Sequence, residues 1–318
     1  MAHRMSILES KRGPKDSRPE PRRPAVPVVL FAYARPAHLR RVLDCLRENR
    51  VPRILAFADG AKGARDARAV DDTRTVLRAI DWAEVTLVER ERNLGLGRNV
   101  ISGVSEVAAR EEAFIVWEDD LVCVPGTYDW LCAALAAYAH EARVMSVTAW
   151  THPRVTPPGI GSAPYLDGRA ECWVWAAWSR SWRGMESETA LQKAAGAKLR
   201  GIAADAYGAD LPGMARDEAR RNIWAVRWLY HHFQNGGLCV RPPWSMVDHI
   251  GTDAGATNAI GPGDWAGVTL RPAPPIPTEW PEPREDPACR PLWRASNPAV
   301  SLAARIARRI RRILRVQR

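Results

Sequence analysis

The sequence contains no hydrophobic run of the length that a membrane span needs, which is about 20 residues. Its longest apolar run, residues 26–34, is shorter and is interrupted by Pro27. The first twenty residues are polar and basic and contain no apolar stretch of the kind a signal peptide needs, so we expect no secretory signal. With 46% hydrophobic and 26% charged residues, the composition is that of a globular protein, and we predict a cytoplasmic one.

Cysteine motifs are also missing. The six cysteines form no C-x-x-C pair and no spacing typical of zinc ligands. We therefore expect reduced and mostly buried thiols, as is usual in the cytosol.

Little of the net charge of +10 lies in the body of the chain. Residues 1–25 carry seven Lys or Arg against three acids, and residues 301–318 carry seven Arg and no acid, which leaves a net charge of −1 for the rest. A nucleic-acid-binding protein more often carries a basic stripe on its folded body. The balance therefore argues against a nucleic-acid partner.

Strand and helix patterns alternate over the first half of the chain. Short apolar runs alternate with segments of helical periodicity. The strands are predicted over 26–33, 53–58, 84–89, 113–117 and 144–149, and the helices over 38–49, 71–80, 99–110 and 128–140. This alternation predicts an α/β fold, a mostly parallel sheet flanked by helices.

Periodicity weakens after residue 150, although helices are still predicted over 190–207 and 216–234. We expect one large domain, with two halves that share one sheet and one cleft. The predicted organisation is a disordered basic tail (1–25), a first half (26–150), a second half (151–267), a Pro-rich extended segment (268–300) and a basic amphipathic helix (301–318).

Three acidic residues, Glu118, Asp119 and Asp120, directly follow the strand predicted over 113–117. Adjacent carboxylates repel one another, and hard divalent cations such as Mg²⁺ or Mn²⁺ take carboxylate oxygens and bridge to substrate phosphates. Ligands of parallel sheets lie at the carboxyl ends of the strands. We therefore favour a metal site over a solvated acidic turn.

Two polar loops follow other predicted strands. Asp59-Gly60 is able to accept hydrogen bonds from a base or ribose, or to form an ordinary turn. The loop at residues 93–97, Asn-Leu-Gly-Leu-Gly, opens a helix whose N-terminus favours an anion. Such a loop taken alone is more often a tight turn and helix cap.

Tryptophan is concentrated in residues 172–182, where it occurs four times. Indole rings stack on the C–H faces of sugars, and they also fill cores. Both interpretations apply here and to Trp224 and Trp228, which flank Arg227. The tail at residues 301–318 has the pattern of an amphipathic helix, which predicts contact either with an anionic membrane surface or with its own domain.

The ordered motifs resemble those of GT-A-fold glycosyltransferases over about residues 26–260. The similarity is to bacterial family-2-like sugar transferases and, distantly, to N-acetylglucosaminyltransferase I. The motifs that carry it are Phe31-Ala32-Tyr33-Ala34-Arg35-Pro36, Asp59-Gly60, Asn93-Leu94-Gly95-Leu96-Gly97, Glu118-Asp119-Asp120, the tryptophans of 173–182, Trp224-Ala225-Val226-Arg227-Trp228, Gly236 to Pro242, and Ile250-Gly251-Thr252-Asp253.

The resemblance implies a Rossmann-like GT-A domain that binds a UDP- or GDP-sugar in its first half and a glycan or lipid-linked acceptor in its second. It implies that Asp120 holds Mn²⁺ or Mg²⁺ and that the reaction inverts the anomeric carbon. The donor-binding residues that it implies are Ala32, Arg35, Asp59, Asn93, Gly95, Arg98, Glu118 and Asp119. The acceptor-binding residues are Trp173, Trp175, Trp178, Trp224 and Arg227.

The sequence departs from the family pattern in two places. The family carries an acidic residue just before the Trp of its W-x-x-R-W segment, where this chain has Arg221-Asn222-Ile223. The nearest candidates for the catalytic base are Asp217 and Glu218. A later D-G-S-G-T-H pattern lacks its His here, where Asn258 stands.

Two other functions stay open on the sequence alone. One is a nucleotidyltransferase that makes an activated sugar, although residues 32–38 lack the glycine-rich phosphate loop of such enzymes. The other is a catalytically silent module that binds a nucleotide-sugar or a glycan. We also expect the tail to place the protein on the inner face of the plasma membrane.

Overall fold

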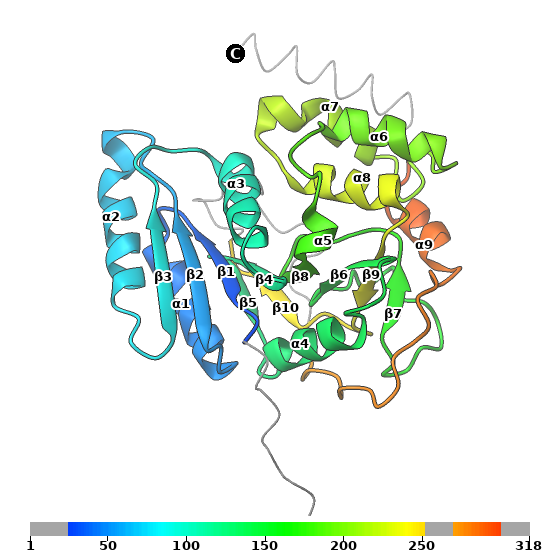
Figure 1. Ribbon diagram of the computed structural model, residues 1–318, viewed down its shortest axis with the longest axis horizontal. Coiled ribbons are helices and arrows are strands. Elements are labelled where there is room, and N and C mark those ends of the chain that lie inside the picture. The colour runs from blue at the N-terminus through cyan, green and yellow to red at the C-terminus, as the bar shows by residue number, and fades with distance from the viewer. Residues whose placement is uncertain (1–24, 252–269, 300–318) are drawn as a thin grey trace, which may run out of the picture.

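A computed structural model describes residues 25–251 and 270–299 of the chain. They form one mixed α/β domain around an eight-stranded sheet with the order β3-β2-β1-β4-β8-β6-β9-β7 (Figure 1). Its strands are β1 (Val28–Ala32), β2 (Arg53–Ala58), β3 (Glu84–Glu89), β4 (Ala113–Glu118), β6 (Val144–Thr148), β7 (Tyr165–Asp167), β8 (Trp175–Trp178) and β9 (Leu238–Arg241). A separate two-stranded sheet pairs β5 (Leu121–Cys123) with β10 (Val247–His249).

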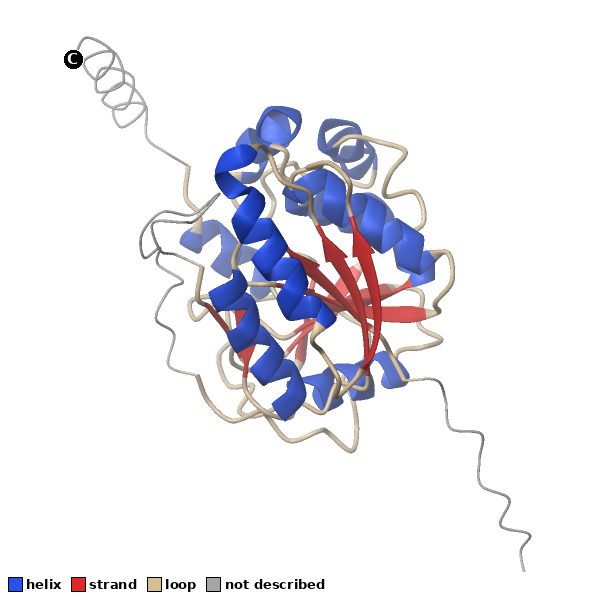
Figure 2. Cartoon of the chain, turned by 90° about the vertical axis from the view of Figure 1, so that its left-hand side faces the viewer, coloured by secondary structure: helices blue, strands red, loops and turns tan. Residues whose placement is uncertain are grey.

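Helices flank the sheet on both faces (Figure 2). They are α1 (Pro36–Glu48), α2 (Ala64–Arg78), α3 (Leu96–Ala108), α4 (Thr127–Ala137), α5 (Ser179–Trp182), α6 (Ala190–Leu199), α7 (Leu211–Arg221), α8 (Ala225–Asn235) and α9 (Cys289–Ser296). Within the described ranges, no helix is both long enough and apolar enough to cross a membrane.

The first four strands of the sheet, β3-β2-β1-β4, are all parallel, as the alternating pattern predicts. β1 is buried along its whole length, because its neighbours β2 and β4 cover both edges and helices cover both faces. Val28 and Leu30 pack with α1 and α4, whereas Val29 and Phe31 face α3. Because β1 is parallel to both β2 and β4, the carboxyl ends of these three strands lie at the same end of the sheet.

The second half of the sheet is mixed. β8 lies antiparallel between β4 and β6, β6 and β9 are parallel, and β7 closes the sheet antiparallel to β9. Parallel pairings still outnumber antiparallel ones. The predicted mostly parallel sheet is therefore confirmed, and all six cysteines are free, four of them buried, as expected.

Three predicted elements differ from those observed. The helix predicted over 216–234 is two helices, because Asn222 has a left-handed backbone (φ 49°) and separates α7 from α8. The helix predicted over 190–207 ends at Leu199. The segment 268–300, predicted to be extended, contains α9. The predicted tails, residues 1–25 and 301–318, lie outside the described residues apart from Ala25.

A buried ion pair joins α9 to the far edge of the sheet. Arg241 Nε donates to Asp167 Oδ2 at 2.7 Å, and both side chains are fully buried. Arg241 also donates to the carbonyls of Trp150 and Arg169, and Trp293 Nε1 donates to the same Asp167 oxygen at 2.7 Å. The two charges are thus solvated by the protein itself, which makes the pair tolerable in an apolar region.

We predict that Asp167→Ala lowers the free energy of unfolding by about 3–5 kcal/mol, because it removes the closest carboxylate from the buried Arg241 charge and leaves only Glu171, at 3.5 Å. The control Asp72→Ala removes an exposed partner of Arg68 at 4.0 Å and changes stability by less than about 1 kcal/mol. Urea denaturation of both variants measures the difference. Equal losses of unfolding free energy in the two variants would contradict a stabilising role for the buried ion pair.

Candidate functional site

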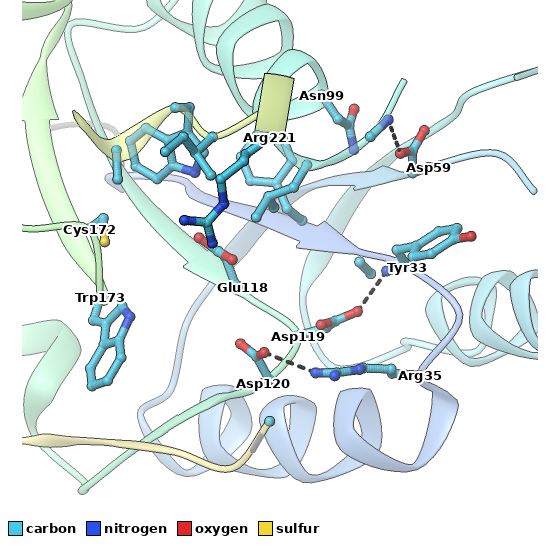
Figure 3. A pocket seen from close by; sticks show the side chains of 18 of the residues that line it. Tyr33, Arg35, Asp59, Asn99, Glu118, Asp119, Asp120, Cys172, Trp173 and Arg221 are labelled. Atoms are coloured by element: carbon cyan, nitrogen blue, oxygen red, sulfur yellow. Dashed lines mark hydrogen bonds and ion pairs between the residues drawn. The ribbon is translucent and has the colours of Figure 1, made fainter. Parts of the chain in front are cut away.

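A cavity of about 410 Å³ opens beyond the carboxyl ends of β1, β2 and β4 (Figure 3). Its floor is formed by residues at the end of β1 and just after it, by Asp59 after β2 and by the acidic residues at the end of β4. Its roof is formed where α7 meets α8, by Arg221, Ile223, Trp224 and Ala225. Its size suits a small organic ligand. Its position is the one where open α/β sheets bind ligands.

The three predicted acids converge on this floor. Glu118 ends β4, and Asp119 and Asp120 follow it in the turn to β5. Asp119 Oδ2 accepts a hydrogen bond from the Tyr33 backbone N–H at 2.6 Å. Asp120 Oδ2 lies 3.0 Å from Arg35 Nη1 and 3.5 Å from His249 Nε2.

Negative charge is crowded at this strand end. Burial, followed by repulsion from Asp120, raises the pKa of Asp119 to about 8. Burial, followed by repulsion from Asp120 and Asp119, raises the pKa of Glu118 well above its usual value. A cation bound here would relieve both effects.

The acidic residues fit a divalent metal in part. Among the residues that the structure describes, no group of three or more His, Cys, Asp or Glu side chains is arranged to hold a metal ion by itself. Mg²⁺ typically takes only one or two carboxylates from the protein and completes its shell with water and substrate phosphates. The hard oxygen donors of Asp120 and its neighbours suit that kind of site, with Asp120 on the cavity surface.

Asp59 organises the loop beside the cavity. Its carboxylate accepts four hydrogen bonds, from the backbone N–H groups of Gly60, Leu94 and Gly95 and from the Asn93 side chain, at 2.8–3.1 Å. Both oxygens are thus engaged by the chain itself. Asp59, Asn93 and Gly95 all line the cavity. The main structural role of Asp59 is to hold the loop at residues 93–97 in place.

The glycines of that loop make room for another part of the protein. The Gly97 N–H donates to the Asn222 carbonyl at 3.0 Å, and Asn222 Nδ2 donates to the Leu94 carbonyl at 3.2 Å. A Cβ on Gly97 would lie 2.5 Å from the Asn222 oxygen. The N–H groups of Leu94, Gly95 and Gly97 therefore face protein acceptors. The loop forms a tight turn and helix cap, and these three N–H groups are already engaged by the chain itself.

Arg98 lies on the exposed side of α3 and does not line the cavity, so the structure gives no support to its predicted donor contact. The next residue, Asn99, points into the cavity instead (Figure 3). Ala32 and Arg35, also predicted to bind the donor, both line the floor.

The tryptophans divide between the cavity and the core. Trp173 lines the cavity and stacks on His249 with ring centroids 4.9 Å apart, and Trp224 borders it from the roof. Trp175 and Trp178 are buried and do not line the cavity, so the structure gives no support to their predicted acceptor contact. Trp175 packs instead against Trp182, Trp224 and Trp228. Sequence alone does not separate these roles, because both need an indole ring.

The two candidate bases also have structural partners. Glu218 is buried, where it accepts from Arg227 Nε at 2.5 Å and from the Ala190 N–H at 2.8 Å, so it joins α6, α7 and α8. Asp217 pairs with Arg220 at 3.0 Å on the surface. Neither carboxylate lines the cavity, and neither does Arg227. We therefore do not carry these three residues into the site.

Several lining residues were not predicted from the sequence. They are Tyr33, Lys62, Cys172, Met214, Arg221 and His249. Tyr33 lies within a motif that was recognised. The others carry no local signal: Lys62 and Cys172 lie in loops, Met214 and Arg221 in α7, and His249 at the end of β10. Only the pairing of β10 with β5 brings His249 to Asp120.

Comparisons with known proteins give limited likenesses. No family model and no curated protein matches the sequence. A mannosyltransferase from Pyrobaculum calidifontis, solved with GDP-Man and Mn²⁺, is similar over 49% of this chain and 45% of its own (18% identity, TM-score 0.35). HddC from Yersinia pseudotuberculosis, solved with GMP-PN, is similar over 49% of this chain and 77% of its own, with 13% identity and a TM-score of 0.33. An inositol-1-phosphate CTP transferase from T. maritima is similar over 52% of this chain and 75% of its own, with 15% identity and a TM-score of 0.29.

This chain thus spans less than half the length of the mannosyltransferase.

We predict that Gly97→Ala lowers the melting temperature, because its Cβ meets the Asn222 carbonyl at the contact between α3 and the roof. Gly213→Ala is the matched control. It also lies in a helix, its Cβ would have only the end of the Arg216 side chain at 4.0 Å, and it raises stability by about 0.5–1 kcal/mol. Differential scanning calorimetry compares the two, and an equal gain in both variants would show that the contact is unimportant.

Proposed function

We propose that this protein is a metal-dependent glycosyltransferase that moves a sugar from a UDP- or GDP-sugar to a glycan or lipid-linked acceptor. One observation carries the proposal. Three crowded carboxylates, Glu118, Asp119 and Asp120, stand on the floor of a cavity at the ligand-binding edge of a parallel sheet. Such a strand end suits a divalent cation together with a diphosphate.

In this proposal, Asp120 holds Mn²⁺ or Mg²⁺ together with the donor diphosphate. The metal, when bound, supplies Lewis-acid stabilisation of the departing diphosphate. Glu118 and Asp119 hold the ribose and the donor sugar. Arg35, Ala32 and the loop that Asp59 fixes surround the nucleoside, with Tyr33 and Asn99 as further contacts. Trp173 offers an aromatic face to a sugar ring.

A nucleotidyltransferase that makes an activated sugar is the second candidate. The same acidic floor suits a nucleoside triphosphate with its metal, so the cavity alone favours neither chemistry. The turn after β1, residues 33–35, contains no glycine and leads directly into α1, which favours glycosyl transfer. A silent binding module would bind the nucleotide without turnover.

Nucleotide binding gives the first test. We predict that UDP or GDP raises the melting temperature only in the presence of Mn²⁺, and that Asp120→Ala abolishes the shift while Asp72→Ala retains it. A ligand at a hundredfold excess over its Kd stabilises the fold by about 2.7 kcal/mol. No shift with any nucleoside diphosphate or sugar nucleotide would contradict the proposal.

Products separate the two enzymes from the silent module. Release of a nucleoside diphosphate from a nucleotide-sugar supports glycosyl transfer, and release of pyrophosphate from a nucleoside triphosphate and a sugar phosphate supports the alternative.

Membrane contact through residues 301–318 is a separate proposal, based on their sequence alone: seven arginines and an apolar face. We predict that the full chain co-sediments with vesicles containing phosphatidylglycerol and that a chain ending at Pro298 does so less, with a difference that shrinks at high salt. Unchanged sedimentation of the shortened chain would contradict a membrane role for the tail.

A further inference from the structure

The roof of the cavity carries a cation. Arg221, the last residue of α7, lines the cavity, and its guanidinium points into it (Figure 3). Asn222 follows it and is bonded to both Gly97 and Leu94, so the backbone beside Arg221 is held against α3. The position of the cation is therefore set by the fold.

This arginine has no carboxylate partner in the described part of the chain. The nearby acids are already paired: Asp217 with Arg220 and Glu218 with Arg227. The other two cations of the cavity lie on the floor, where Arg35 contacts Asp120 and Lys62 covers the Tyr33 ring. Arg221 is thus the cation that the roof offers to a ligand.

The roof, in contrast, offers no carboxylate among its described residues. The acids that line the cavity are Asp59, Glu118, Asp119 and Asp120. Asp59 is saturated by four hydrogen bonds, and the other three form the acidic floor. The roof residues that an acceptor would meet, Arg221, Met214 and Ile223, therefore include no carboxylate.

This composition bears on the nature of the attacking group. A sugar or lipid hydroxyl needs a base to remove its proton in the transition state. An ionised phosphate oxygen carries no proton to remove. A guanidinium, which is always charged, binds two oxygens of such a phosphate with parallel hydrogen bonds.

We propose that the acceptor is a phosphate monoester, bound by Arg221. An ionised phosphate oxygen attacks the anomeric carbon, a new C–O bond forms to that oxygen, and the bond from the anomeric carbon to the nucleoside diphosphate breaks. The electron pair leaves with the diphosphate. The product is a glycosyl phosphodiester, and no base is required. This inference rests on the proposed glycosyl transfer and names its acceptor class.

The test compares phosphates with the corresponding alcohols. The full-length protein is incubated with Mn²⁺ and each of UDP-glucose, UDP-N-acetylglucosamine and GDP-mannose. The acceptors are citronellyl phosphate, glucose 1-phosphate, citronellol and glucose. We expect release of nucleoside diphosphate, with a glycosyl phosphodiester detected by mass spectrometry, to be at least about tenfold faster with a phosphate than with its alcohol. The two phosphates distinguish a lipid-borne acceptor from a soluble one.

Variants at the roof assign the effect to Arg221. Arg221→Ala should lower the rate with the phosphate by about ten- to a hundredfold, since a hydrogen bond to a charged group contributes about 1.5–3 kcal/mol. Arg221→Lys should restore part of it. Arg220→Ala, the neighbouring surface arginine paired with Asp217, is the matched control and should stay within about twofold. Equal losses in Arg220→Ala and Arg221→Ala would overturn the assignment.

A binding measurement adds a readout other than turnover. Calorimetric titration of phenyl phosphate into the protein with UDP or GDP and Mn²⁺ should show binding that Arg221→Ala weakens and Arg220→Ala does not. If the nucleotides bind but alcohols react as fast as phosphates, the inference is wrong while the proposed function stands. If no nucleotide binds with metal, the proposed function itself fails.

Discussion

The contact between Asn222 and the N-terminal end of α3 is the constraint on which the cavity depends. It joins the first half of the domain to the loop between α7 and α8, and so it sets the height of the roof above the acidic floor. Two glycines make it possible, because a Cβ on Gly95 or Gly97 would collide with Asn222. On the other side of the same loop, Asp59 holds Leu94 and Gly95 by their backbone N–H groups.

These bonds change the meaning of the glycine-punctuated loop. Backbone N–H groups at a helix start attract anions when they are vacant. Here a carboxylate and a carbonyl of the same chain already occupy those of residues 94, 95 and 97, so the glycines serve packing between two parts of the fold. The charge that remains for a ligand is held elsewhere, by the carboxylates of Glu118 to Asp120 on the floor and the guanidinium of Arg221 on the roof. This separation suits a substrate pair in which one phosphate meets a metal and the other meets an arginine.

Periodicity predicted the parallel half of the sheet and the acidic strand end, because both are local. β1 and β4 are short, apolar and β-branched, and an acid placed directly after such a strand must lie at the edge of the sheet. The antiparallel insertion of β8 and the division of α7 from α8 were not predictable in the same way. The place of β8 depends on its pairing with β4 and β6, which are distant in the sequence. The break at Asn222 is stabilised by hydrogen bonds to residues more than 100 positions away.

The sequence by itself therefore determined the α/β class, the unpaired cysteines and the place of the carboxylates along the chain, since each follows from short-range pattern. Only the tertiary structure decided which residues face the cavity. Trp173 and Trp175 are two positions apart, yet one lines the cavity and the other is core. Glu218 is buried in an ion pair, whereas Arg221, less than one helical turn further, points into the cavity. The physical reason is that long-range packing chooses which side chains are buried, and a local pattern contains no information about that choice.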